Sequence, residues 1–166
     1  MTACSLLVLM VIAGSCKINY SMTGASIPPT AKTISIPYFP NNAQLVVPTL
    51  SQTITDAVRD RFTSQTNLSL TNSGGDLVIE GSISGYTVSP VAIQGNETAG
   101  LNRLSIKVTI KFTNTINESQ SFDNVTFERY VDYPSTSNLA DVQDGLISQV
   151  TEQLVDDIFN KSVVNW

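Results

Sequence analysis

Three basic side chains recur at every fourth residue of one segment, at Arg103, Lys107 and Lys111. Segment 103–112 alternates between polar and apolar residues, which is the pattern of a β-strand with one buried face. In such a strand the three cations share the polar face. A row of cations on a flat sheet can hold phosphates or acidic sugars through charge-assisted hydrogen bonds. The row is therefore the first candidate for a ligand-binding site.

The same cations have carboxylates within reach if the segment forms a hairpin with residues 122–133. One register matches apolar residues along both strands, and a shift of one residue would lose the match. That register pairs Arg103 with Asp132 and Lys107 with Glu128. Lys111 then faces Asn124 and is unpaired. We favour an ion-paired surface over a ligand site, since each cross-strand pair stabilises by a few tenths to about 1 kcal/mol.

Other chemistry is poorly represented in the chain. It contains no histidine, which excludes Ser-His-Asp and Cys-His catalysis and histidine-ligated metals. We find no glycine-rich phosphate loop, and we interpret the carboxylate pair Asp156 and Asp157 as a solvated helix face. The sequence therefore predicts a protein that is not an enzyme and that holds no metal or cofactor. The net charge of −5 also argues against a nucleic-acid partner.

The second candidate site is Cys16, which directly follows the apolar run 6–12 and three small residues. The run is too short to span a bilayer but has the length of a signal-peptide core. The sequence Ala-Gly-Ser-Cys resembles the lipobox of bacterial lipoproteins, in which the cysteine becomes the lipid-modified first residue. We therefore predict a signal peptide over 1–15, acyl chains such as palmitate on Cys16, and a tether over 16–32. The alternative is an ordinary secretory signal with a cysteine nearby by chance.

The elements that would position the basic row follow from periodicity. A strand over 33–36, at an edge of the sheet, precedes a helix over 48–66, where Thr49 and Gln52 form a capping-box pattern. In the turn-rich connection 37–48, five apolar residues are expected to cover one end of the core: Tyr38, Phe39, Leu45, Val46 and Val47. Apolar residues change parity beyond Gly85, which predicts a bulge in the strand that begins at Leu77.

A second amphipathic helix begins after Asn138, its expected N-cap. Trp166 is expected to fold back onto the sheet or the helix, and the alternative is that it is exposed at a free terminus. Arg129 shares the parity of the apolar residues around it, so either a bulge turns it out or its head group reaches the rim of the covered face. The order β-α-β-β-β-α predicts a single α+β domain over 33–166. Its two amphipathic helices pack on one face of a mostly antiparallel four-stranded sheet. A short extra strand over 68–70 is possible.

Four stretches carry a resemblance to a known family. They are ISIPYFPNNAQLVVPTLSQTITDAVRDRF, GDLVIEGSISGYTVSPVAIQG, NRLSIKVTIKFTN and IFNKSVVNW. Together they span nearly all of the mature chain. They resemble the lipopolysaccharide-assembly lipoprotein family (LptE), in its Bacteroidetes branch. The resemblance implies two helices over a four-stranded sheet on an N-terminal lipid. Ligand-binding residues known in the family are basic, and Arg103, Lys107 and Lys111 are the basic candidates here.

The resemblance also implies a function. Family members sit as a plug inside the large outer-membrane β-barrel (LptD-like) that delivers lipopolysaccharide to the cell surface, assist its assembly, and bind lipopolysaccharide. No acidic run follows Cys16, which favours retention on the periplasmic face of the outer membrane. The alternative function is a stand-alone periplasmic carrier that binds a lipid or glycan between helices and sheet.

Overall fold

A computed structural model describes residues 27–28, 30–91 and 100–164. Cys16, the tether up to residue 26 and Trp166 lie outside the described residues, as does most of the loop that follows Val91. The elements are β1 (Thr33–Ser35), α2 (Leu50–Gln65), β2 (Ser69–Thr71), β3 (Leu77–Val91), β4 (Leu101–Asn114), the 3₁₀ turn η1 (Glu118–Gln120), β5 (Phe122–Pro134) and α3 (Leu139–Val163).

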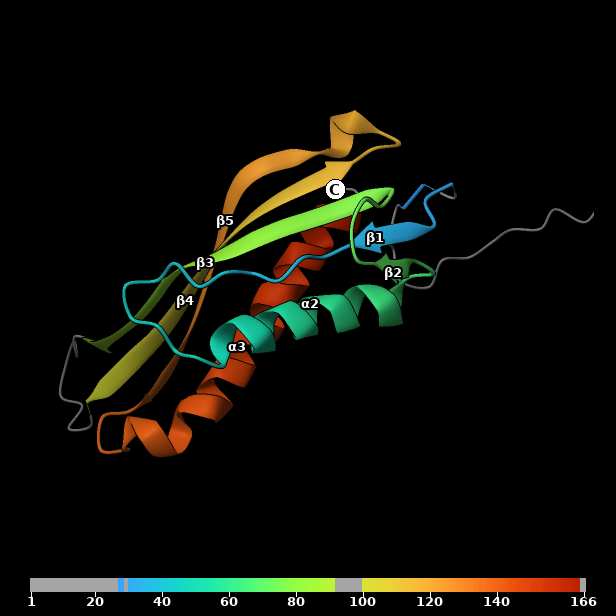
Figure 1. Ribbon diagram of the computed structural model, residues 1–166. Coiled ribbons are helices and arrows are strands. Elements are labelled where there is room, and N and C mark those ends of the chain that lie inside the picture. Colours follow the sequence, from blue (N-terminus) through green and yellow to red (C-terminus); the bar gives the residue numbers. More distant parts are fainter. Residues whose placement is uncertain (1–26, 29, 92–99, 165–166) are drawn as a thin grey trace, which may run out of the picture.

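The strands form one five-stranded sheet in the order β2-β1-β3-β4-β5 (Figure 1). β1 runs parallel to both β2 and β3, whereas β3, β4 and β5 pair antiparallel. The predicted α+β class is confirmed. The extra short strand considered at 68–70 is present as β2, so the sheet has five strands in place of four and is mixed. The prediction that the first strand lies at an edge is wrong, because β2 pairs with β1 on its outer side. Helix α2 crosses over between β1 and β2 and returns the chain in the same direction, which allows parallel pairing.

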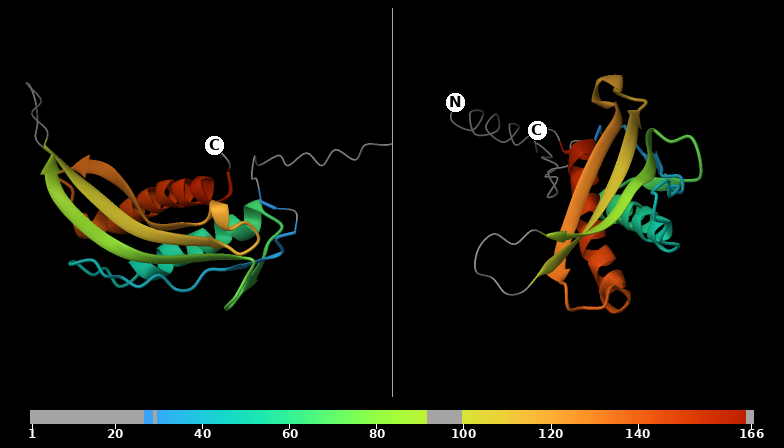
Figure 2. Two further views of the ribbon diagram at one scale, coloured as in Figure 1. Left: turned by 90° about the horizontal axis from the view of Figure 1, so that it is seen from above. Right: turned by 90° about the vertical axis from the view of Figure 1, so that its left-hand side faces the viewer.

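Both helices lie on one side of the sheet, as Figures 1 and 2 show. Phe62 of α2 meets Phe159 of α3 edge to face, with ring centroids 5.1 Å apart. Beneath them the alternating residues of β4 are buried, as predicted: Leu104, Ile106, Val108, Ile110 and Phe112. Burying one such side chain stabilises the fold by about 1.5–3 kcal/mol. The core therefore fills the space between the helices and the sheet.

The two helix starts differ from each other. Asn138 has an extended backbone, and its side chain accepts a hydrogen bond from the amide of Ala140, so the predicted N-cap of α3 is confirmed. The capping box at α2 is wrong. Thr49 has φ −82° and ψ −17°, already helical, and its side chain makes no capping hydrogen bond. An N-cap side chain needs an extended backbone to reach back to the helix amides. Gln52 instead donates to Asp56 at 2.8 Å.

The segment between β1 and α2 follows the edge of β3, where Asn41 forms a parallel bridge with Ile83. Phe39 is fully buried, and its amide donates to the hydroxyl of Thr55 at 3.1 Å. Val47 packs partly against the core. The other residues expected to cover the core are exposed: Tyr38 by 55%, Leu45 by 55% and Val46 by 58%. Phe39 is thus the main anchor of this segment.

Two irregularities bend the long strands. The bulge predicted near Gly85 is confirmed as a register shift between Ile83 and Gly85 in the pairing of β3 with β4. A second shift lies between Ile110 and Phe112, where β4 pairs with β5. There Asn124 has φ 54°, a left-handed conformation that asparagine adopts more readily than most residues. Along β5 beyond this shift, the predicted hairpin register is confirmed.

Gly81 of β3 provides the room into which the Phe39 ring packs. A Cβ atom at Gly81 would lie 2.7 Å from two ring atoms of Phe39 and 2.8 Å from Cδ1 of Ile110. Both side chains are fully buried and have little freedom to move. We predict that Gly81→Ala lowers the free energy of unfolding by about 1–3 kcal/mol, measured by urea denaturation.

The matched control is Ser82→Ala, the next residue, on the opposite face of β3. It should stay within about 0.5 kcal/mol of wild type. Equal stability of the two variants would contradict the assigned role of Gly81.

Candidate functional site

The face of the sheet that the helices leave open carries the three candidate cations. Arg103, Lys107 and Lys111 all lie on this open face of β4, as predicted, and successive cations are separated by roughly 13 Å along the strand. The neighbouring strands contribute carboxylates and hydroxyls to the same face. The chemistry of the row therefore depends on how these neighbours engage each cation.

Arg103 forms the best-defined pair of the row. Its Nε and Nη2 atoms donate to the two carboxylate oxygens of Asp132 at 2.7 and 2.8 Å, a bidentate arrangement. The guanidinium carbon also lies 3.6 Å from the ring centroid of Tyr130. The hydrogen bonds from Arg103 lower the pKa of Asp132, and the same contact raises the pKa of Arg103. This cation is held on two sides.

Lys107 pairs with Glu128, as the predicted register requires, with Nζ 3.2 Å from Oε2. The other oxygen of Glu128 accepts a hydrogen bond from the Ser105 hydroxyl at 2.7 Å. The pKa of Glu128 is lowered mainly by the hydrogen bond from Ser105 and further by Lys107. The carboxylate therefore stays charged beside the lysine at neutral pH.

Lys111 is also paired, and the prediction that it lacks a partner is wrong. Its Nζ lies 3.0 Å from Oε2 of Glu80, which sits directly opposite on β3. This contact raises the pKa of Lys111. The hairpin with β5 offered only Asn124, whereas the partner comes from the other neighbouring strand. An estimate of the β3–β4 register, including the bulge near Gly85, would have been needed to find it.

Neutral hydroxyls connect the charged pairs across the open face. The Thr109 hydroxyl lies 3.1 Å from that of Ser84 on β3 and 3.0 Å from that of Thr126 on β5. Each cation of the row is paired with one carboxylate, so the row and its partners add no net charge to the open face. It is a hydrogen-bonding surface whose ion pairs are half exposed, and an incoming polar group can compete for them at low cost.

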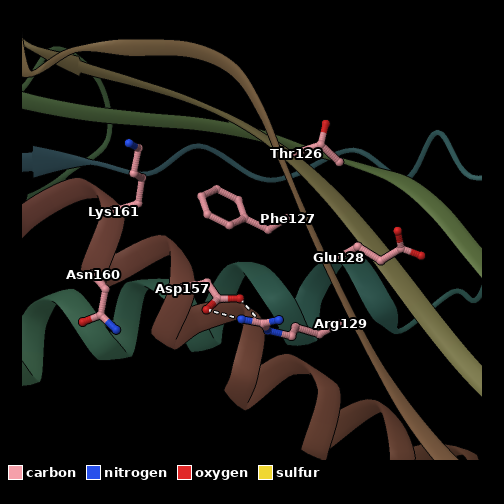
Figure 3. A pocket seen from close by; sticks show the side chains of 7 residues that line it. All are labelled: Thr126, Phe127, Glu128, Arg129, Asp157, Asn160 and Lys161. Carbon is pink, nitrogen blue, oxygen red and sulfur yellow. Dashed lines mark hydrogen bonds and ion pairs between the residues drawn. The ribbon is translucent and has the colours of Figure 1, made fainter.

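A separate charged site lies on the helix side of β5, shown in Figure 3. Arg129 faces Ile106 in register, and its Nε and Nη2 atoms contact the carboxylate of Asp157 on α3 at 2.7 Å each. The second of the two expected positions for Arg129, at the rim of the covered face, is therefore confirmed. Asp156 pairs with Arg61 of α2. The interpretation of Asp156 and Asp157 as merely solvated is wrong, because each joins α3 to another element.

Within residues 27–28, 30–91 and 100–164, no group of three or more carboxylates or cysteines is arranged to hold a metal ion. None of the helices in this part of the chain is both long and apolar enough to cross a membrane.

Two solved structures of low sequence identity with TM-scores above 0.5 share this fold. A Helicobacter pylori protein described as a neuraminyllactose-binding hemagglutinin homologue aligns with a TM-score of 0.53 at 8% identity, over 86% of this chain and 88% of that one. A Xanthomonas campestris protein aligns with a TM-score of 0.51 at 11% identity, over 81% and 87%. A minor lipoprotein of Acinetobacter baumannii gives 0.44 at 17% identity, over 82% and 96%. No curated protein matches the chain.

The fold and the open face thus define a two-layer α+β domain with a helix-covered face and a polar face. Residues 31–162 match the family described as lipopolysaccharide-assembly, LptE. The match covers most of the chain, and the chain belongs to this family of envelope lipoproteins.

The Arg103–Asp132 pair generates a pH-dependent prediction. Because the folded-state pKa of Asp132 lies below its ordinary value of 3.8, the stabilisation is complete well above that pH and is lost as pH falls through the folded-state pKa. Asp132→Asn should therefore destabilise the protein by up to about 1 kcal/mol at pH near 7. Thermal unfolding temperatures of the two proteins should converge in acid, once the pH falls below the folded-state pKa of Asp132. A difference that persists unchanged in acid would contradict a charge-based contribution.

Proposed function

We propose that the chain is an outer-membrane lipoprotein, anchored on the periplasmic face through lipid on Cys16, that serves as plug and assembly factor of the lipopolysaccharide export barrel. Membership of the lipopolysaccharide-assembly family supports this role. The observation that carries it is the open face of β3, β4 and β5. A plug in the lumen of a barrel must present a polar surface to a polar wall, and this face is polar along three long strands.

The charge arrangement on the open face suits such a contact. Burying a lone charge against a partner costs several kcal/mol, whereas a charge that brings its own hydrogen-bonded partner costs far less. Arg103, Lys107 and Lys111 each bring a carboxylate, and Thr109 links hydroxyls across the strands. The barrel wall can therefore pack on this face without supplying a matching charge for each cation.

The alternative, a carrier that holds a lipid or glycan between helices and sheet, finds less support. That space is occupied by side chains of the core, including Phe62, Ile106 and Leu154, which are fully buried. A carried molecule would have to displace them. Replacing a buried large side chain with a smaller one typically costs 2–5 kcal/mol, so opening this space is expensive.

Affinity purification of the full-length protein after mild detergent extraction tests the proposal. We expect a β-barrel protein to be recovered in near-equal amount, because a plug is a stoichiometric subunit. Mass spectrometry of the same preparation should show acyl chains on Cys16. A monomer recovered without a barrel would contradict the plug role and favour the carrier. An unmodified Cys16 thiol would contradict the anchor.

We further propose that the open face contributes to lipopolysaccharide contact. An anionic phosphate can replace the carboxylate partner of Lys107 or Lys111, because both ion pairs are half exposed and hold their partners weakly. The double reversal Lys107→Glu and Lys111→Glu should lower lipopolysaccharide binding or barrel recovery severalfold. The fold should persist, because both side chains point away from the core. Circular dichroism melting checks the fold.

The matched control exchanges the charges within each pair, adding Glu80→Lys and Glu128→Lys to the double reversal. It restores both ion pairs and the net charge while moving each cation to the neighbouring strand. Recovery of binding in the control would place the effect in charge balance and not in the lysine positions. If the double reversal itself binds as well as wild type, the row is only a salt-bridged surface.

A further inference from the structure

β5 lies at one end of the sheet and is 13 residues long. Within the described residues, no strand pairs with its outer edge. The opposite edge strand, β2, has only three residues. A long edge strand presents a row of backbone N–H and C=O groups that can pair with an added strand. The two edges therefore differ greatly in their capacity to accept a partner.

The side chains of β5 on its helix side are incompletely covered. Val125, Phe127 and Val131 are half-buried, whereas their cross-strand partners on β4 are fully buried. The β4 side chains on the helix side are thus covered more completely than those of β5. An additional strand beside β5 would place alternate side chains on this side, where they would cover the exposed parts of these three residues.

A shallow hollow of about 440 Å³ marks the centre of this edge. In Figure 3 the Phe127 ring points into it from β5, with Lys161 and Asn160 on the α3 side and the Arg129–Asp157 pair below. Glu128 also borders the hollow, but it points away toward the open face, where Ser105 and Lys107 hold it. The hollow therefore combines an aromatic surface with hydrogen-bonding and charged groups.

Its charge balance favours an anion. On the helix side of the edge two cations, Arg129 and Lys161, stand against one carboxylate, Asp157. Asp157 pairs with Arg129, and Lys161 has no carboxylate partner among the described residues. A carboxylate brought in beside them would be matched, whereas a third cation would be repelled.

The β5 strand of a second copy does not supply this carboxylate. In a two-fold pairing of β5 with itself, the strand residues that arrive on the helix side come from the same row of the partner copy. That row is Val125, Phe127, Arg129, Val131 and Tyr133, which adds a cation and no acid. A charged residue that faces inward on an edge strand is a known device against unwanted edge pairing. Arg129 therefore disfavours self-association and purely apolar strands.

We propose that the outer edge of β5 is a docking site for an extended segment of another polypeptide, with a carboxylate opposite Arg129 and apolar side chains on either side of it. The backbone edge supplies affinity, Phe127 and its apolar neighbours supply the surface, and Arg129 with Lys161 selects the acidic residue. This site is distinct from the open face, so it stands or falls separately from recovery of the barrel.

The test uses the full chain in detergent and a capped peptide of sequence Thr-Val-Thr-Glu-Thr-Val-Thr, whose valines and glutamate share one face. The control peptide carries lysine in place of glutamate. Hydrogen–deuterium exchange should show slower exchange of β5 amides with the glutamate peptide. Fluorescence anisotropy should show that it binds about tenfold tighter than the lysine peptide, since one attractive contact becomes repulsive.

Arg129→Gln should remove most of this preference, because it leaves Lys161 balanced by Asp157. The matched variant Arg103→Gln removes a comparable ion pair from the open face and should keep the preference. Thermal melting verifies that both variants are folded. Equal binding of the two peptides, or no added protection of β5 amides, would overturn the proposal. A concentration-dependent dimer of the chain alone that protects β5 would assign the edge to a second copy instead.

Discussion

The alternation of β4 is the constraint on which the rest of the structure depends. Successive side chains of a strand point to opposite faces. The register that buries the apolar residues from Leu104 to Phe112 therefore also puts the cations between them on the open face. The apolar set is covered by two helices, and the polar set stays open. A shift of one residue would bury Lys107 and expose Ile106, so the core locks the position of every open-face side chain. The function proposed for the open face thus rests on the stability of the opposite one.

Residues with strong local patterns were predictable, and those set by distant partners were not. The match of Ile110 with Val125 gave the β4–β5 register, and with it two of the three ion pairs on the open face. The third, Lys111 with Glu80, depends on the β3–β4 register, which the sequence pattern did not fix even though it predicted the bulge near Gly85. The alternation at 33–36 likewise predicted the strand β1, but a strand of three residues does not show which strands pair with it or in which direction. Sequence patterns predict well which residues are buried. They predict which residue a polar side chain contacts only when the register of the neighbouring strands is known.

Charged residues make up only 14% of this chain, and most of the basic ones form ion pairs. Six of the nine Lys and Arg residues form ion pairs within the described part of the chain. Some join elements, as Arg61 of α2 joins Asp156 of α3. Each exposed pair of this kind contributes little to stability. Together they leave a surface that can contact another polar surface without burying an unpaired charge. This property matters more for a domain enclosed by a partner than for one surrounded by water.

The open face and the outer edge of β5 differ in how their charges are balanced. On the open face every cation of the row has its own carboxylate, so a partner of almost any polarity can approach, and selectivity must come from shape and from competition for weak pairs. At the edge, Arg129 and Lys161 outnumber Asp157, so the charge itself discriminates among strands that the backbone would accept alike. A face whose charges are all paired can contact many kinds of polar surface. An excess of positive charge beside exposed backbone groups favours only strands that carry an acidic residue. The domain can therefore contact a barrel wall and bind an added strand at the same time. The wall would contact the open face of β5, whereas the added strand would pair with its outer edge.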